Sequence, residues 1–247
     1  MKSYLRSSFY KSGENMETNE EKRCIVLLSG GLDSVTCLAL AKKQGFKVHA
    51  ISFDYGQRHK IELICAEKAA KSLGAEFHLI NFRLGVEEEA SALTSTTREI
   101  PDYIPGEHGV PSTYVPARNL LFLSFATAFA ESVGAKDIFI GVNSIDYSGY
   151  PDCRPEFIKA FAESARLGTK ACDENWRFNI HAPLQDLRKK EIIELGLSLG
   201  VDYSLTRSCY NPLPGGLACG KCDSCGLRQE AFRALGLEDP ALTTKIE

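Results

Sequence analysis

An apolar run that leads directly into a glycine-rich turn is the feature that most constrains the fold of this chain. Cys24–Leu28 is apolar, and residues 29–34 read S-G-G-L-D-S before a helical pattern begins. Glycine lets a backbone come close to a phosphate, and the unpaired N–H groups at a helix N-terminus favour an anion. The stretch therefore predicts a strand, a phosphate-binding loop and a helix. The alternative interpretation is an ordinary glycine turn between a strand and a helix.

The loop lacks the lysine of the G-x-x-x-x-G-K-[S/T] phosphate-binding loop. It instead resembles the PP-loop of the ATP pyrophosphatase superfamily, whose members form an adenylated intermediate and release pyrophosphate. In that resemblance the two serines and the two glycines hold the phosphates, and Asp33 either orients Mg²⁺ or caps the helix. The residues expected to bind ATP are Leu28, Ser29, Gly30, Gly31, Leu32, Asp33, Ser34, Val35, Thr36, Cys37 and Leu38.

Strand and helix patterns alternate along the chain. The expected strands are 24–28, 47–53, 76–80, 137–142 and 178–181, and the expected helices are 35–44, 60–73, 116–133, 155–167 and 186–199. This alternation predicts an α/β fold with a doubly wound, mostly parallel sheet, which in the superfamily resemblance is Rossmann-like and of the adenine nucleotide hydrolase type. Ligands of such sheets bind at the carboxyl ends of the strands.

We expect three parts in the chain. Residues 1–22 are polar and show no periodicity, which predicts a disordered leader. Residues 23–205 form the α/β domain, in which the polar, proline-broken stretch 83–115 is long enough to serve as a lid. Residues 206–247 form a small zinc-binding segment and a helix.

Charge and composition disfavour nucleic acid and membrane as partners. The 247-residue chain has a net charge of −3 and a pI near 6.0, so it offers no broad basic surface for direct nucleic-acid binding. It contains no apolar run of about 18 residues that would span a membrane. Its nine cysteines include single apolar positions within strand and helix patterns, which fits a reducing compartment. We therefore expect a cytoplasmic protein with a small anionic substrate.

Four cysteines near the end of the chain share the spacing C-x9-C-x2-C-x2-C. They are Cys209, Cys219, Cys222 and Cys225. Four thiolates fill a tetrahedral Zn²⁺ and leave no position for water, so the spacing predicts a structural zinc site. An iron–sulfur cluster and a redox or sulfur-transfer pair are the alternatives.

Three further motifs make a more specific resemblance. They are F-D-Y-G-Q-R-H at 53–59, P-A-R-N at 116–119 and G-V-N-S-I-D-Y-S-G-Y-P-D-C-R at 141–154. Together with the glycine loop and the cysteine segment, they resemble the QueC family of 7-cyano-7-deazaguanine synthases over residues 23–236. The resemblance implies an ATP-dependent carbon–nitrogen ligase that converts 7-carboxy-7-deazaguanine and ammonia to 7-cyano-7-deazaguanine, a queuosine precursor. Adenylated carboxylate and amide intermediates are implied, although release of ADP and phosphate is the alternative at each stage.

Physical roles follow for the charged and aromatic residues of these motifs. The expected catalytic residues are Ser29, Asp33, Arg118 and Lys189. The expected substrate-binding residues are Tyr55, Gln57, Arg58, Asn143, Asp146, Tyr150, Asp152 and Arg154. Arginines neutralise phosphate or carboxylate, carboxylates accept from a guanine-like N–H edge, and tyrosines stack on a base. Structural ion pairs, turn capping and a solvated helix face are the alternatives, and His59 is either a proton carrier or a surface residue.

Two other functions compete with this interpretation. A PP-loop tRNA sulfurtransferase would carry a basic RNA-binding extension and a reactive cysteine pair. A non-catalytic nucleotide and zinc-binding module would keep the loop without the aromatic segment at 146–154. The chain has little length for a glutaminase domain, so free ammonia is the expected nitrogen donor, and a homodimer is expected from the family resemblance.

Overall fold

The fold is built on one parallel sheet. The computed structural model describes residues 22–84, 88–106, 109–145, 150–174 and 176–246, so most of the predicted leader and Asp146 lie outside the described residues. The strands are β1 (Arg23–Leu27), β2 (Lys47–Asp54), β3 (Glu76–Asn81), β4 (Asp137–Phe139) and β5 (Asn179–His181). They lie in the order β3-β2-β1-β4-β5, and every neighbouring pair is parallel. The strand order reverses between β1 and β4.

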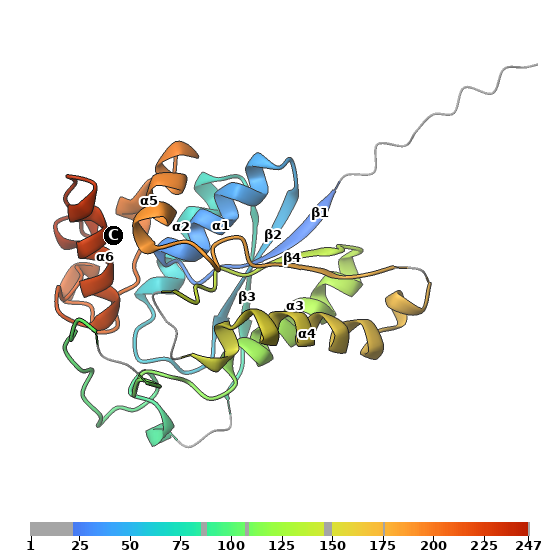
Figure 1. The fold of residues 1–247 in the computed structure, drawn as a ribbon, viewed down its shortest axis with the longest axis horizontal. Coiled ribbons are helices and arrows are strands. Elements are labelled where there is room, and N and C mark those ends of the chain that lie inside the picture. The colour runs from blue at the N-terminus through green and yellow to red at the C-terminus, as the bar shows by residue number, and fades with distance from the viewer. Residues whose placement is uncertain (1–21, 85–87, 107–108, 146–149, 175, 247) are drawn as a thin grey trace, which may run out of the picture.

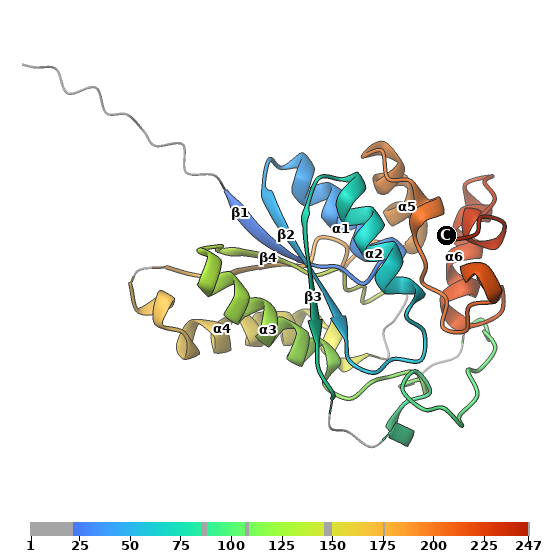
Figure 2. The ribbon, with the colours of Figure 1, turned by 180° about the vertical axis from the view of Figure 1, so that it is seen from behind.

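Helices cover both faces of the sheet. They are α1 (Leu32–Lys43), α2 (Ile61–Ser72), α3 (Arg118–Val133), α4 (Pro155–Gly168), α5 (Lys189–Ser198) and α6 (Asp223–Ala234). Figures 1 and 2 show α1, α2 and α5 on one face and α3 and α4 on the other, with α6 beside α5. The predicted doubly wound α/β fold is therefore confirmed. None of the helices in the described ranges combines the length and apolarity needed to cross a bilayer.

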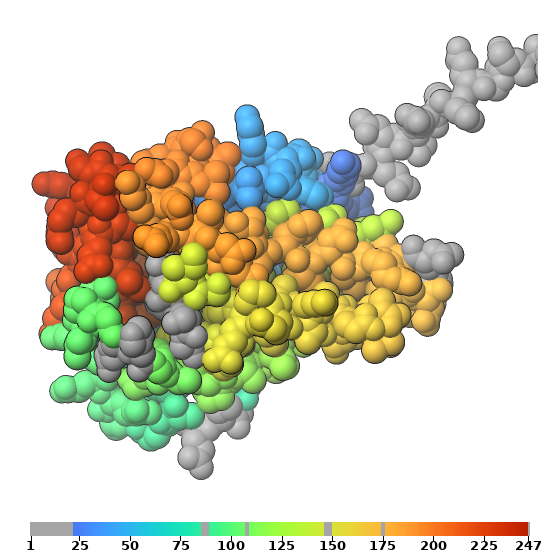
Figure 3. Space-filling model, in the orientation of Figure 1, coloured from blue at the N-terminus to red at the C-terminus, as the bar shows by residue number. Residues whose placement is uncertain are grey.

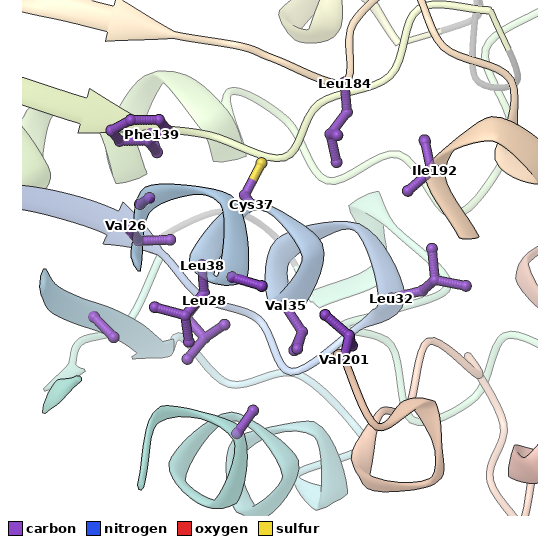
Figure 4. Packing of buried hydrophobic residues seen from close by; sticks show 14 of the residues in the cluster. Val26, Leu28, Leu32, Val35, Cys37, Leu38, Phe139, Leu184, Ile192 and Val201 are labelled. Atoms are coloured by element: carbon purple, nitrogen blue, oxygen red, sulfur yellow. The ribbon is translucent and has the colours of Figure 1, made fainter. Parts of the chain in front are cut away.

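The first core fixes helix α1 against the sheet. Leu32, Val35 and Leu38 of this helix are almost fully buried, and they pack with Val26 of β1 and Ile192 of α5 (Figure 4). Because the apolar positions face both the sheet and α5, the helix cannot rotate without exposing one set of them. This packing holds the N-terminus of α1 at the carboxyl end of β1.

A second core, on the other face of the sheet, fixes helix α3 against the sheet. The rings of Phe53 at the end of β2 and Phe122 of α3 stack with centroids 4.1 Å apart, and Phe125 packs against Phe53 at 5.8 Å. Leu123 and Ala126 are fully buried in the same cluster. The first turn of α3 is thereby held at the carboxyl edge of the sheet, which is the edge where α1 begins.

The stretch predicted as a lid lies against the cysteine segment. Asp102 forms an isolated antiparallel bridge with Cys222, and Tyr103 N–H donates to the Lys221 carbonyl over 2.7 Å. A Cβ on Gly226 would lie 2.1 Å from the Tyr103 ring, so this glycine lets the two segments meet. Figure 3 shows the corresponding green and red surfaces in contact. Closure of the stretch over a ligand remains a prediction.

Candidate active site

A cavity of about 220 Å³ opens where the strand order reverses. Residues 27–29 and 31–34, which follow β1, form one wall, and residues 140–143 after β4 form another. A parallel sheet binds ligands at such a point because the connections that follow the two neighbouring strands run to opposite faces of the sheet and leave a crevice between them. The remaining lining comes from the end of β2 and the start of α2, from the first turns of α3, from residues 150 and 153, and from residues 207, 208, 210 and 224 of the C-terminal part.

Two serines close the glycine loop on itself. The Ser29 backbone N–H donates to Ser34 Oγ over 3.2 Å, and Ser34 Oγ donates to the Gly31 carbonyl over 3.1 Å. The two serine hydroxyl oxygens lie 3.1 Å apart. The Ser29 side chain is exposed and Ser34 also lines the cavity, so the loop presents serine hydroxyl groups to a ligand. An anion such as phosphate suits this set of donors.

Packing of α2 explains why position 30 is glycine. Its φ of +82° lies in the left-handed region, and a Cβ there would come within 2.1 Å of the Glu62 carbonyl oxygen and 2.7 Å of Ala66 N. The sequence argument attributed this glycine to close approach of a phosphate. The structure adds a second reason, because α2 crosses the loop so closely that no side chain fits.

The C-terminal part of the chain completes the loop. Ser208 Oγ accepts from the N–H of Leu32, the first residue of α1, over 3.1 Å. The neighbouring Arg207 N–H donates to the Gly30 carbonyl over 2.9 Å. The Arg207 side chain is 1% exposed, and its guanidinium donates to main-chain carbonyls, including those of Ser204 and Thr206. The sequence analysis did not assign Ser208 to the site, because its partner in the loop lies 176 residues earlier.

Two predicted catalytic residues form an ion pair beside the loop. Lys189 Nζ at the start of α5 lies 2.8 Å from both carboxylate oxygens of Asp33 in α1. Lys189 is buried, whereas the Asp33 side chain is 23% exposed and lines the cavity. The pair therefore fixes a carboxylate at the mouth of the phosphate-binding loop.

Arg118 brings a positive charge to the same cavity. Ala117 adopts a left-handed conformation with φ of 56°, and this turn directs the chain into α3, whose first residue is Arg118. Among the described residues, the hydrogen-bond partner of its guanidinium is the Tyr55 hydroxyl at 3.5 Å, and no carboxylate pairs with it. A half-buried arginine without an acidic partner is suited to bind a phosphate or carboxylate ligand.

Glu62 is a cavity residue that the motif analysis missed. It lies in the first turn of α2, where Gln57 Nε2 donates to its Oε1 over 3.2 Å. Burial raises the pKa of the Glu62 carboxyl to about 7, although nearby Arg118 and the bond from Gln57 oppose the shift. A carboxyl that titrates near neutral pH is suited to accept a proton in a reaction.

This shift predicts a distinctive pH dependence of stability. From the ordinary pKa of 4.5 up to about 7, the unfolded chain has released a proton that folded Glu62 still holds. The free energy of unfolding therefore falls as pH rises through this window. Glu62→Gln removes this pH dependence. The urea midpoint of the variant should therefore rise relative to that of the wild type as the pH increases from 5 to 8. Exposed Glu67→Gln on the same helix is the control, and an equal gain there would refute the assignment.

The predicted site residues divide into two groups. Those that line the cavity are Leu28, Ser29, Gly31, Leu32, Asp33, Ser34, Tyr55, Arg118, Asn143 and Tyr150. Those outside the lining are Gly30, Val35, Thr36, Cys37, Leu38, Gln57, Arg58, Asp152, Arg154 and Lys189. The loop and α3 thus come together as the motifs imply, while the buried face of α1 belongs to the core.

Several side chains that were predicted to contact substrate form hydrogen bonds within the protein. Gln57 Oε1 accepts from the Tyr55 N–H and its Nε2 donates to the Phe53 carbonyl, both over 2.9 Å. Arg58 donates to the Arg98 carbonyl over 2.7 Å, away from the cavity. Asp152 accepts from the Asn119 N–H over 3.0 Å near the start of α3. These side chains shape the loops around the cavity.

Two predicted residues of the motif at 141–154 do face the cavity. Asn143 is buried, and its Nδ2 donates to the carbonyls of Leu184 and Leu187. The Tyr150 hydroxyl lies 2.9 Å from Thr113 Oγ1, and burial raises its pKa. The P-A-R-N motif and Tyr150 both line the cavity, where a flat ligand can contact the Tyr150 ring.

The four cysteine thiols of residues 209, 219, 222 and 225 converge. Their sulfur atoms all lie within 4.8 Å of one another, and those of Cys219 and Cys225 are 3.9 Å apart. Tetrahedral zinc with bonds of about 2.3 Å would separate its sulfur ligands by about 3.8 Å. Main-chain N–H groups of Tyr210 and Cys219 donate to sulfur atoms in the cluster. The donor set and its geometry therefore fit a metal ion such as zinc.

Comparisons with known proteins agree with the motifs. Residues 23–236 match the family described as queuosine biosynthesis protein QueC. The chain is 56% identical to 7-cyano-7-deazaguanine synthase of Dechloromonas aromatica, over 90% of this chain and 98% of the relative. It is 55% identical to the enzyme of the same name from Pseudomonas syringae, over 90% and 98%. Among solved structures, NMN synthetase from Francisella tularensis is 18% identical with a TM-score of 0.47, over 88% of this chain and 78% of the other.

Proposed function

The chain belongs to the QueC family of queuosine biosynthesis proteins, and from this premise we propose that it is an ATP-dependent 7-cyano-7-deazaguanine synthase. Its substrate is 7-carboxy-7-deazaguanine, and ammonia supplies the nitrile nitrogen. The family assignment agrees with the resemblance that the motifs indicated. The observation that carries the proposal is that one cavity is lined both by the serine-containing loop and by Arg118, which has no acidic partner among the described residues.

The loop and its ion pair form the ATP half of the site. The Ser29 and Ser34 hydroxyls bind the phosphates at the N-terminus of α1, where the helix dipole also favours an anion. The Asp33 carboxylate lines the cavity beside the loop, so it would hold Mg²⁺, a cation that prefers oxygen ligands. Lys189 positions that carboxylate and limits its freedom to rotate.

Arg118 and the aromatic wall form the acceptor half. The guanidinium of Arg118 binds the substrate carboxylate or the charge that develops on the α-phosphate. Tyr150 contacts the deazapurine plane, as an aromatic ring of the cavity wall can do. Glu62, with its pKa near 7, accepts a proton when ammonia adds.

The reaction needs two activations of the same carbon. A carboxylate oxygen attacks the α-phosphorus of ATP and pyrophosphate leaves, which makes AMP the leaving group in place of oxide. Ammonia then displaces AMP and loses a proton, giving the amide. A second ATP adenylates the amide oxygen, and loss of AMP and of the remaining N–H protons leaves the nitrile. The site thus uses the same phosphate contacts twice.

The cysteine cluster has a structural part in this proposal. Zinc held by the four thiolates has no open position, so it takes no step in the reaction. Its contribution is to order residues 207 and 208, which complete the phosphate-binding loop. We also propose that the enzyme is cytoplasmic and that it forms a homodimer. Gel filtration of the purified protein tests the dimer.

Product analysis tests the proposed function directly. Protein incubated with ATP, Mg²⁺, ammonium and 7-carboxy-7-deazaguanine should form the nitrile, seen by mass spectrometry, and omission of any organic reactant or of ammonium should abolish it. AMP and pyrophosphate should accumulate in step with product. Failure of folded, zinc-loaded protein to form either amide or nitrile would overturn the proposal. Release of ADP and phosphate would retain the synthase and overturn the adenylate intermediates.

A further inference from the structure

Two histidines and a glutamate converge at the amino ends of two neighbouring strands. His49 lies near the start of β2, and Glu76 is the first residue of β3, directly paired with it in the parallel register. His78 follows two residues after Glu76, so the strand alternation puts both on one face of the sheet. The cavity lies at the opposite, carboxyl ends of the strands, so this cluster is separate from the proposed active site.

The Glu76 carboxylate faces both imidazoles. His49 Nδ1 lies 3.2 Å from His78 Nε2 and 3.3 Å from Glu76 Oε2, and His78 Nε2 lies 3.4 Å from the other carboxylate oxygen, Oε1. Tetrahedral zinc with bonds of about 2.0–2.1 Å to nitrogen and oxygen would separate its ligand atoms by about 3.3–3.4 Å, which is close to these three spacings. We propose that His49, His78 and Glu76 bind a divalent transition-metal ion such as Zn²⁺.

Hydrogen bonding and metal binding use the same atoms of this cluster. A neutral histidine has one N–H group and one lone pair. If one facing nitrogen carries a proton, it can donate to the lone pair of the other over 3.2 Å, and if both do, each can donate to its own oxygen of Glu76. If neither does, two nitrogen lone pairs and the carboxylate face one another, and a cation between them is the group that satisfies all three residues.

The surroundings support ordered ligands and an open outer side. His49 is 7% exposed, and the ring of Phe129 packs 5.8 Å from it and 4.7 Å from the His78 ring, which fixes both imidazoles. The side chain of Glu76 is 55% exposed, so water can supply the remaining ligand. Arg23 and Lys47 are the neighbouring cations, and their repulsion weakens binding without blocking the exposed side.

The function of this ion follows from its place in the sheet. Strand β3 is at the edge, and it pairs with the rest of the sheet through β2. A metal bound by His49 on one strand and by two residues on the other would link them at their amino ends. The ion therefore stabilises the sheet edge, with no part in the chemistry at the carboxyl ends.

Metal titration of the purified full-length protein tests the proposal. Protein with its cysteine-bound metal already measured is titrated with Zn²⁺ by calorimetry, and one further equivalent should bind and raise the melting temperature. Glu76→Gln and His78→Ala should each weaken that equivalent by at least about 10-fold, because even outer-shell changes weaken metal sites by 10–100-fold. Glu67→Gln, an exposed carboxylate on α2, is the matched control and should bind like the wild type.

Cobalt distinguishes the two sites. Thiolate-bound Co²⁺ gives sulfur-to-metal charge-transfer absorption, whereas an ion bound by two imidazoles and a carboxylate does not. The further equivalent should therefore bind without that band. Absence of a further equivalent, or a further equivalent that both variants retain unchanged, would overturn the proposed site. Neither result depends on whether the protein makes the nitrile.

Discussion

Replacing Arg118 with methionine should lower kcat/KM for nitrile formation by about 10²–10³-fold, the usual cost of removing one preorganised charge-stabilising group. The loss should be electrostatic, because methionine keeps much of the apolar stem of arginine. The fold should persist, since among the described residues the guanidinium has one long hydrogen bond, to Tyr55, and no acidic partner. Steady-state kinetics and circular dichroism of the same preparation measure both effects.

Arg154→Met is the matched control for that experiment. Arg154 belongs to the separate motif at 141–154 and was expected from the sequence to contact substrate, yet it is exposed and does not line the cavity. Its replacement should change kcat/KM by less than about 3-fold, as for most exposed side chains outside a site. If Arg154→Met were the damaging change and Arg118→Met the harmless one, the site would have to be rebuilt around a different surface.

Replacing Cys222 with serine should remove the metal and destabilise the C-terminal segment. Cys222 is 1% exposed, its sulfur accepts from the Tyr210 N–H, and its backbone pairs with Asp102. Loss of about 2–5 kcal/mol would lower the melting temperature of a chain of this size by about 4–20 °C. Metal content by mass spectrometry and thermal unfolding measure the two consequences.

Cys172→Ser separates loss of metal from loss of a buried thiol. Cys172 is also buried, at 6% exposure, but it lies outside the cluster, so this variant should keep its zinc. A Cys222→Ser protein with undiminished zinc would contradict the four-cysteine site. Because Ser208 lies next to Cys209, metal loss should also weaken ATP binding, and Ser208→Ala should reproduce that weakening with zinc retained.

Local sequence patterns were sufficient for the layers of the fold. Apolar runs such as 24–28 and 47–53 predicted β1 and β2 to within a residue, because buried parallel strands need continuous apolar side chains. The start of α1 was less accurate. The pattern placed it at Val35, whereas the helix begins at Leu32, where a distant serine hydroxyl caps the first turn. No periodicity within the helix can report that contact.

The site likewise contains residues that short motifs predict and residues that only the packing reveals. Glycines, serines and Arg118 carry their chemistry in short motifs, and the cavity brings them together. Glu62 was missed because its importance comes from burial beside Arg118, which depends on how α2 packs. Gln57 was expected to contact substrate, but its amide groups are taken up by backbone groups two and four residues away. A motif thus marks a residue as constrained without saying what constrains it.

The contacts of residues 207 and 208 with the glycine loop also set an order for folding during synthesis. The loop emerges early, with β1 and α1, and strands β1 to β3 can pair while the chain is still growing. The N–H of Leu32 and the carbonyl of Gly30 find their partners only after about 175 further residues have been added. A nascent chain shorter than this therefore has a partly assembled sheet but no finished nucleotide loop, and it cannot consume ATP before most of the enzyme exists.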